Sequence, residues 1–150
     1  MTEQILVFVK PHAVKDAKAF EILGRIESYF PIVGVKIMEA TNLLVRAHYS
    51  EHQDKPFFLD LIDQLVGQLV VAAVFEGPEG MIKMIREDLV GATNPAEAKQ
   101  GTIRHDFGEG TPDNAIHASD SPESARREIS FWFGSDRLVP YRPRVIDHVI

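Results

Sequence analysis

The segment Leu69-Val70-Val71-Ala72-Ala73-Val74-Phe75 is the clearest strand signal in the chain, and the fold prediction is built outward from it. A continuous apolar run of this length, bounded by turn residues, is typical of a strand that is buried on both faces. Gly77-Pro78 then opens a helix, and Gly91 is expected to end it. The inward positions of this helix are Met81, Ile82, Ile85 and Leu89.

Two further strands are predicted on the N-terminal side of this segment. Ile5 to Val9 is a second continuous apolar run, and Lys10-Pro11 should end it because proline interrupts a central strand. Ile32 to Met38 is the other, with Val33, Val35 and Ile37 expected on one face. Between these strands, Asp16 is expected to cap a helix with apolar positions at Ala19, Ile22, Leu23, Ile26, Tyr29 and Phe30. Residues 41–67 predict short helices, of which the later one carries Phe57, Phe58, Leu61, Ile62 and Leu65.

The C-terminal side begins with an extended stretch from Ala92 to Asp113, in which Asn94 could cap a single helical turn. Loops of this length in compact domains are usually functional. A short strand near Ala115-Ile116 follows, and then a helix to Phe133 that starts at Ser121-Pro122. Apart from short insertions the order is βαββαβ, which predicts an α+β, ferredoxin-like fold: a four-stranded antiparallel sheet with helices packed on it.

Composition limits the classes of protein to which the chain can belong. With 150 residues and 45% hydrophobic content we expect one globular domain over residues 1–150, with residues 134–150 as a C-terminal tail. Zero cysteines exclude a disulfide scaffold and a cysteine nucleophile. No apolar run approaches the ~20 residues that cross a bilayer, and the first residues show no secretory signal, so we expect no membrane association and a cytoplasmic location.

The net charge of −6 argues against general nucleic-acid binding, which relies on basic residues to neutralise phosphates. No specific nucleic-acid partner is therefore expected. An acidic protein can still bind a small polyphosphate if it gathers cations locally. The candidates for such a cluster are Lys10, Arg86 and Arg104.

His117 is the residue that suggests a chemistry. It lies just before the predicted helix at Ser121, and a helix N-terminus favours an anion. Imidazole is partly neutral, and so nucleophilic, near pH 7. A nucleophile beside an anion site suggests phosphoryl transfer onto His117, although a lone histidine at a strand end is more often structural.

The chain resembles nucleoside diphosphate kinases from Ile5 to Phe133. The segments that carry this resemblance occur in order along the chain: Val9-Lys10-Pro11, His48-Tyr49, Lys55-Pro56-Phe57-Phe58, Val70-Val71-Ala72, Gly91-Ala92-Thr93-Asn94-Pro95-Ala96, Gly101-Thr102-Ile103-Arg104-His105-Asp106-Phe107 and Asn114-Ala115-Ile116-His117-Ala118-Ser119-Asp120-Ser121. The resemblance implies an enzyme that moves the γ-phosphate of a nucleoside triphosphate, typically ATP, to a nucleoside diphosphate. It implies ping-pong transfer through phospho-His117, low base specificity, Mg²⁺ carried on the nucleotide phosphates with no metal ligand from the protein, and a hexamer or tetramer.

The resemblance also implies roles for individual residues. His117 matches the phosphorylated histidine, Glu128 the carboxylate that orients it, and Ser119 a hydrogen-bonding partner beside them. Phe57 matches the aromatic residue on which the base stacks, with Leu61 next to it, and Arg86 matches an arginine on a helix. The positions that hold phosphates or ribose are matched by Lys10, Tyr49, Thr93, Arg104 and Asn114.

Taken singly, these residues have simpler interpretations. Lys10 could be a solvated lysine, Phe57 a core residue and Arg86 a surface charge. Glu128 could form an exposed ion pair worth under ~1 kcal/mol. His48 and His52 have the i,i+4 spacing of a zinc pair on a helix, but no third ligand follows them in the sequence.

Three departures from the family pattern stand out. The family's Lys-Pro-Asp-Gly is Lys10-Pro11-His12-Ala13 here, and Ala13 would pay roughly 1–2 kcal/mol for a positive φ. Ala118 replaces a glycine and should place a methyl group next to the nucleophile. The helix that carries Arg86 is longer by a residue on each side, which leaves the direction of Arg86 open. The departures at residues 12, 13 and 118 motivate one alternative, a nucleotide-binding or interaction module with weak catalysis. A more remote alternative is a ferredoxin-like regulatory domain that binds a small anion, and the spacing of Arg104 and His117 argues against it.

Overall fold

The computed structural model describes residues 1–139, and its centre is a four-stranded sheet in the order β2-β3-β1-β4. The strands are β1 (Thr2–Val9), β2 (Ile32–Glu39), β3 (Leu69–Pro78) and β4 (Ile116–Ala118). Every neighbouring pair is antiparallel. The predicted ferredoxin-like α+β fold is therefore confirmed, and the two continuous apolar runs form its central strands.

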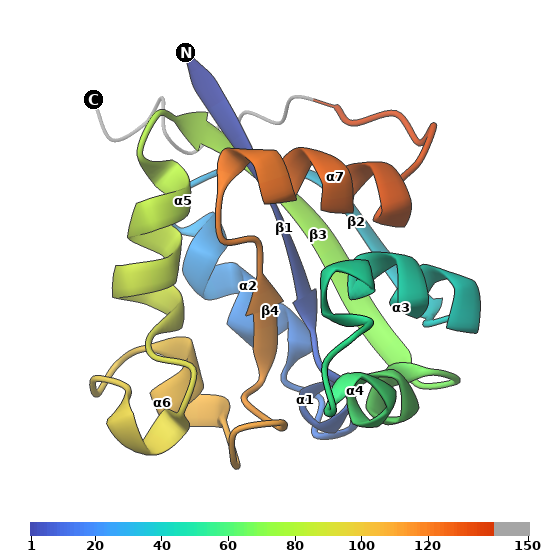
Figure 1. The fold of residues 1–150 in the computed structure, drawn as a ribbon. Helices are drawn as coiled ribbons and strands as arrows, with labels where there is room; N and C mark the ends of the chain where they lie inside the picture. Colours follow the sequence, from blue (N-terminus) through green and yellow to red (C-terminus); the bar gives the residue numbers. More distant parts are fainter. Residues whose placement is uncertain (140–150) are drawn as a thin grey trace, which may run out of the picture.

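The helices cover both faces of the sheet (Figure 1). The α-helices are α1 (Pro11–Lys15), α2 (Ala19–Glu27), α3 (Asn42–His48), α4 (Phe58–Leu65), α5 (Met81–Met84), α6 (Ile103–Phe107) and α7 (Pro122–Trp132). Short elements lie between them: the 3₁₀ turns η1 (Ser50–His52) and η3 (Pro95–Glu97), and the π-helix η2 (Ile85–Val90).

The central strands are apolar throughout because both of their faces are buried. Alternate residues of β1 enter different cores: Ile5, Val7 and Val9 join the core with α2 and α5, whereas Leu6 and Phe8 join the core with α3, α4 and α7. β3 alternates in the same way. This period of two sets which side chains can meet across the sheet.

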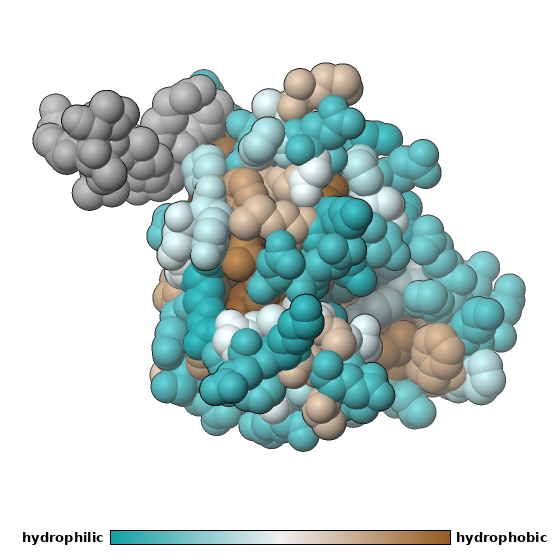
Figure 2. All heavy atoms as spheres, turned by 90° about the vertical axis from the view of Figure 1, so that its left-hand side faces the viewer, coloured by the Kyte–Doolittle hydropathy of each residue, from teal (hydrophilic) through white to brown (hydrophobic). Residues whose placement is uncertain are grey.

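The face that carries α5 and α6 is seen in Figure 2. Hydrophilic side chains cover most of it, and apolar side chains show between them. Among the described residues no helix has the length and apolar content needed to cross a membrane.

The chain from Gly134 to Val139 follows α7 back to the sheet, where the Val139 N–H donates to the Val33 carbonyl at 2.9 Å. The rest of the predicted tail, residues 140–150, lies outside the described part, as does His148.

Several predicted helix ends are confirmed by their hydrogen bonds. Ser121 caps α7 by accepting from the Ser124 N–H, and Asn94 caps η3 by accepting from the Ala96 N–H. Gly91 ends the long helical segment with a φ of +91°, where a Cβ would come within 2.6 Å of the Thr102 hydroxyl. Glycine is therefore required at position 91 for both conformation and space.

Two predictions near the first helix are wrong. Asp16 is not the N-cap of a helix: it is the C-cap residue of α1, and Lys18 is the residue before α2. Ala13 has no positive φ and is a buried residue of α1. The alanines that do have positive φ are Ala17 at 60° and Ala115 at 77°, a conformation that costs an L-residue about 1–2 kcal/mol.

The prediction that Val33, Val35 and Ile37 lie on one face of β2 is wrong. The register shifts between Ile32 and Gly34, so that Val33 is buried whereas Val35 and Ile37 are exposed. A bulge of this kind inserts one residue and reverses the alternation beyond it. The hydrophobic pattern of the sequence cannot reveal such an insertion, because the residue types on both sides of it are apolar.

Candidate active site

His117 lies in the middle of β4, opposite Phe8 of the neighbouring strand β1. Its imidazole stacks on the Phe8 ring, with centroids 4.9 Å apart and planes 19° from parallel. The His48 ring meets it edge-on, at 4.5 Å and 81°. Two aromatic neighbours at a right angle to each other leave the imidazole little freedom to rotate.

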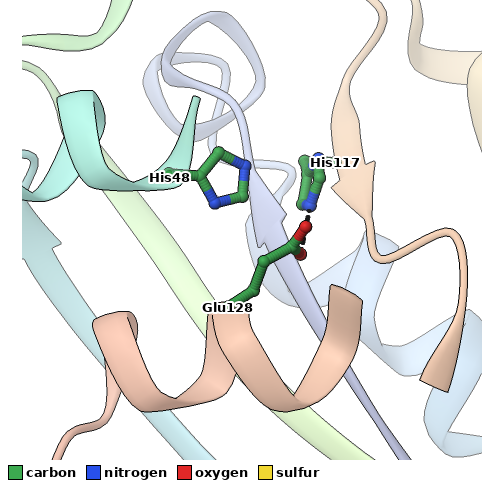
Figure 3. A group of neighbouring side chains, drawn as sticks. All are labelled: His48, His117 and Glu128. Carbon is green, nitrogen blue, oxygen red and sulfur yellow. Dashed lines mark hydrogen bonds and ion pairs between the residues drawn. The ribbon is translucent and has the colours of Figure 1, made fainter. Parts of the chain in front are cut away.

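The partner of His117 is Glu128, which points up from α7 (Figure 3). His117 Nε2 and Glu128 Oε1 are 2.8 Å apart, and the Ser119 hydroxyl donates to the same oxygen at 2.8 Å. An ionised carboxylate only accepts hydrogen bonds, so Nε2 carries the imidazole proton and Nδ1 keeps its lone pair. Burial raises the pKa of Glu128, while the Ser119 hydrogen bond acts in the opposite direction.

The surroundings of His117 keep it neutral. Burial first, and then the positive charges of Lys10 and Arg104, lower its pKa from 6.5 to about 3. A neutral imidazole with a free lone pair is the nucleophilic form. The departure at Ala118 does not disturb it: Ala118 packs into the core with α2 and α5, on the side of the sheet opposite to Phe8, so the expected methyl group beside the nucleophile is wrong.

His48 is a residue of the site that the sequence prediction did not include. Its Nδ1 accepts from the indole Nε1–H of Trp132 at 3.0 Å, across 84 positions of sequence, and burial lowers its pKa to about 3. Trp132 also stacks on Phe8 at 4.8 Å. The apolar strand that contains Phe8 and the helix to Phe133 were predicted from the sequence, but the contact of Phe8 with Trp132 was not.

Within residues 1–139, His48, His117 and Glu128 form one of two groups with three possible metal ligands close together. The hydrogen bonds argue against a metal there. Because His48 Nδ1 accepts from Trp132, its Nε2 carries the proton, and His117 Nε2 is bonded to Glu128. His52 belongs to neither group, so the His48/His52 spacing finds no third ligand among these residues.

Two arginines converge on the carbonyl groups around β4. Arg104 is buried and donates to the carbonyls of Gly91 at 3.2 Å and Ile116 at 2.9 Å. Burial, and then the neighbouring Arg86, lower the pKa of Arg104 to about 10. Arg86 donates to the Ala118 carbonyl at 2.7 Å. The structure therefore directs Arg86 at the site, and it does so through the π-helix η2, a form that accommodates one extra residue in a helix.

Lys10 lies at the end of β1, beside these arginines. Its ammonium donates to the Pro112 carbonyl at 3.0 Å. Burial, and then the charge of Arg104, lower its pKa to about 8. Three cations thus stand near one uncharged histidine. Asp113, beside Lys10, and Asp120, beside His117, offset part of this positive charge, and a bound phosphate could offset more of it.

An open cleft of about 840 Å³ leads to this cluster. It is lined by most of the predicted nucleotide-binding residues, namely Lys10, Tyr49, Phe57, Leu61, Thr93, Arg104 and Asn114. A smaller hollow contains His117, Glu128 and Arg86, and it shares Tyr49 and Arg104 with the cleft. Ser119 is fully buried and lines neither, so it contacts the site only through Glu128.

The polar residues of the cleft offer both hydrogen-bond donors and an acceptor. Burial raises the pKa of Tyr49 to about 12, so its hydroxyl keeps its proton. The Asn114 side chain donates to the Thr93 carbonyl at 2.8 Å, and its buried Oδ1 has no hydrogen-bond partner. The Phe57 side chain is 46% exposed, so it is not part of the core. Its ring offers a surface on which a flat group can stack.

Comparison with known proteins agrees with this geometry. The family model described as "Nucleoside diphosphate kinase" matches residues 3–138. Relatives with the same name include a protein of Archaeoglobus fulgidus, 47% identical over 138 residues (91% of this chain and 90% of the relative), and one of Methanothermobacter thermautotrophicus, 47% identical over 140 residues (93% and 92%).

Solved structures show the same likeness. The chain is similar to a nucleoside diphosphate kinase family protein from Babesia bovis, with a TM-score of 0.89, 40% identity and 99% of both chains covered. It is also similar to the nucleoside diphosphate kinase of Aquifex aeolicus, with a TM-score of 0.86, 38% identity, and 93% and 100% of the two chains covered. The chain belongs to the nucleoside diphosphate kinase family.

Proposed function

We propose that this protein is a nucleoside diphosphate kinase that transfers the γ-phosphate of a nucleoside triphosphate to a nucleoside diphosphate through phospho-His117. The observation that carries the proposal is the 2.8 Å contact between His117 Nε2 and Glu128 Oε1. It occupies one nitrogen of a neutral imidazole and leaves Nδ1 as the nucleophile in a site that is rich in positive charge.

The proposed reaction has two balanced half-reactions. Nδ1 attacks the γ-phosphorus, the bond from that phosphorus to the β,γ-bridging oxygen breaks, and the nucleoside diphosphate leaves with the electron pair. Nε2 keeps its proton throughout, and Glu128 stabilises the positive charge that develops on the ring. A second diphosphate then attacks phospho-His117 by the reverse path, which frees the imidazole again.

Charge stabilisation is the main task of the protein in this chemistry. Arg104 and Arg86 can each grip phosphate oxygens through two donors, and both now donate to carbonyl groups that a phosphate could replace. Lys10 adds a point charge beside them. The Tyr49 hydroxyl and the Asn114 and Thr93 polar groups supply donors without adding charge.

Phosphoryl transfer of this kind uses a divalent cation on the nucleotide, and we propose Mg²⁺. The cleft is lined by the cations Lys10, Lys15 and Arg104 and by the carboxylates Asp60, Asp63 and Asp113. Among residues 1–139 none of these carboxylates belongs to a group of three possible metal ligands, which suits a metal that is held by phosphate oxygens and water rather than by protein side chains. Such an ion would neutralise phosphate charge when bound. The residues of this chain that share the task are Lys10, Arg86 and Arg104.

We expect low base specificity if the nucleotide base only stacks on an apolar surface and makes no specific hydrogen bonds. Phe57, the residue just before α4, and Leu61 on α4 line the cleft and offer an apolar surface, on which any base can stack its π-face. The alternative of a weakly catalytic binding module is not favoured, because the departures at Ala13 and Ala118 lie in the core and His117 keeps its partner Glu128.

We also propose that the protein forms a homo-oligomer, either a hexamer or a tetramer, and that it is located in the cytoplasm.

The test is intact-protein mass spectrometry after brief incubation with Mg·ATP. A gain of about 80 Da, discharged by GDP, is the expected sign of a phosphoenzyme intermediate. His117→Asn should abolish the gain, and the matched control His105→Asn, an exposed histidine on α6, should retain it. Absence of the gain in the wild-type protein, or its persistence in His117→Asn, would overturn the proposal.

A further inference from the structure

The turn before β4 is held by the segment that follows β1. Ala115 is completely buried and has a φ of +77°, so its conformation is unusual for an alanine and its backbone groups cannot reach water. Both groups are bonded to the other segment: the Ala115 N–H donates to His12 Nε2 at 2.9 Å, and the Ala115 carbonyl accepts from the Lys10 N–H at 2.9 Å. Among residues 1–139 the acceptor for this N–H is therefore a side chain and not a backbone group.

The hydrogen bond fixes the protonation pattern of His12. Since Nε2 accepts, the proton of the neutral ring is on Nδ1. That atom is buried and has no hydrogen-bond partner in the described part of the chain, and Glu109 Oε1 is 3.5 Å from it. With Asp16 and Glu109, His12 forms the second group of three possible metal ligands among residues 1–139, but its Nδ1 has no lone pair to offer while Nε2 accepts from Ala115. The role of this histidine is that of a hydrogen-bond acceptor.

The turn that His12 holds connects directly to both parts of the site. Asn114 precedes Ala115; it is 2% exposed, lines the cleft and donates to Thr93. Ile116 follows Ala115, begins β4 next to His117 and gives its carbonyl to Arg104 at 2.9 Å. A relaxed turn at Ala115 would move Asn114 first, because His117 is held independently by Phe8, His48 and Glu128.

We propose that His12 is a positioning residue of the nucleotide site: through the hydrogen bond from Ala115 N–H to its Nε2, it maintains the left-handed turn that places Asn114 in the cleft. The proposal rests on the proposed function, since it assumes that a nucleotide occupies this cleft. It gives a role to the histidine that replaces aspartate in the family pattern. His12 also lines the cleft, but its Nε2 accepts from Ala115 and its Nδ1 lies 3.5 Å from Glu109, so the role proposed for it acts through the backbone of Ala115.

The test compares two substitutions at position 12. His12→Phe keeps a flat ring but removes the acceptor, whereas His12→Gln can place a carbonyl oxygen near the position of Nε2. Isothermal titration calorimetry with Mg·ADP should show about a tenfold weaker affinity for His12→Phe and recovery to within about threefold of wild type for His12→Gln. In rapid-quench phosphorylation, the half-saturating concentration of ATP should rise by the same tenfold in His12→Phe, while the maximal rate changes by less than about threefold.

A control separates positioning from lost stability. Ile26→Val removes a methyl group from the buried face of α2, far along the chain from the turn, and should lower unfolding stability without changing ADP affinity. The inference is overturned if His12→Phe binds ADP as wild type does, if His12→Gln is no better than His12→Phe, or if Ile26→Val reproduces the loss. A wild-type protein that binds ADP but is never phosphorylated would overturn the proposed function and leave the calorimetric comparison as the test of His12.

Discussion

Glu128 Oε1 receives two hydrogen bonds at once, from Nε2 of His117 at 2.8 Å and from the hydroxyl of Ser119 at 2.8 Å. Ser119 is itself anchored in the sheet, because its Oγ also accepts from the Leu6 N–H at 3.1 Å. The carboxylate is thus fixed between a rigid strand and the imidazole. Its position, and not only its charge, determines which nitrogen of His117 is free.

Glu128→Ala should therefore slow phosphorylation of His117 by about a hundredfold, because the ring loses the partner that sets its tautomer and orientation. Ser119→Ala should have a smaller effect, about threefold to tenfold, because the carboxylate loses one of two anchors. Rapid-quench measurement of the phosphoenzyme gives both rates. Glu123→Ala, on the exposed face of the same helix, is the control and should match wild type. A wild-type rate in Glu128→Ala would show that the pair has no catalytic role.

The pH dependence of kcat/KM should be governed by Lys10 on the alkaline side. Its pKa is lowered to about 8 in the free protein, so the ammonium loses its charge as the pH rises through 8 and phosphate binding weakens. On the acid side no loss from His117 is expected above pH 5, because its pKa is about 3 and the ring stays neutral.

Lys10→Arg tests this assignment, since a guanidinium stays charged to much higher pH. The alkaline fall should move upward by at least about one pH unit, whatever the absolute rate of the variant. Lys55→Arg, an exposed lysine, should leave the profile as it is in wild type. An unchanged alkaline fall in Lys10→Arg would assign it to another group.

The fold could be predicted because its central strands carry their own signal. Runs such as Ile5 to Val9 are apolar at every position, and only a strand buried on both faces needs this. The bulge at Val33 and the π-helix at Ile85–Val90 could not be predicted, since each depends on how a neighbouring element fits. The positive φ of Ala115 was missed for the same reason: the residue type argues against it, and tertiary hydrogen bonds maintain it.

In the candidate site, too, the residue types could be predicted from the sequence but the contacts between them could not. His117 and Arg104 were proposed from the motifs that contain them, and Glu128 from the family resemblance beyond those motifs. Their pairings were not, because hydrogen bonds such as that between Trp132 and His48 join residues 84 positions apart. A ring nitrogen that accepts from an indole or a backbone N–H leaves no trace in the local sequence.

Two neutral histidines, the buried His48 and the partly buried His117, should make the protein sensitive to acid. The pKa values of His48 and His117 are lowered to about 3, whereas an unfolded histidine titrates near 6.5, so below pH 6.5 the unfolded chain binds more protons. Stability must then fall as the pH drops from 6.5 toward 3, by up to about 2 kcal/mol per histidine at pH 5.

His48→Asn isolates one of these contributions. Its amide oxygen can still accept from Trp132 Nε1, but it does not titrate. Urea unfolding at pH 7 and pH 5 should show a smaller loss of stability in this variant than in wild type, with His105→Asn as the exposed control. An equal loss in His48→Asn and wild type would mean that His48 is not the neutral, buried group that its surroundings indicate.

Phe57 provides a test of base specificity. The ring is half exposed at the mouth of the cleft, and stacking on an aromatic side chain is worth about 1–3 kcal/mol per base with little dependence on the base. Phe57→Ala should raise KM for ADP, GDP, CDP and UDP by about 10- to 100-fold each, and the four ratios should agree within about threefold. Phe131→Ala is a suitable control, because this ring is exposed to a similar extent on α7 and does not line the cleft. Steady-state assays with the four diphosphates give these KM values. A rise in KM confined to the purine diphosphates would show that Phe57 discriminates by ring size. An unchanged KM for all four would place the base elsewhere in the cleft.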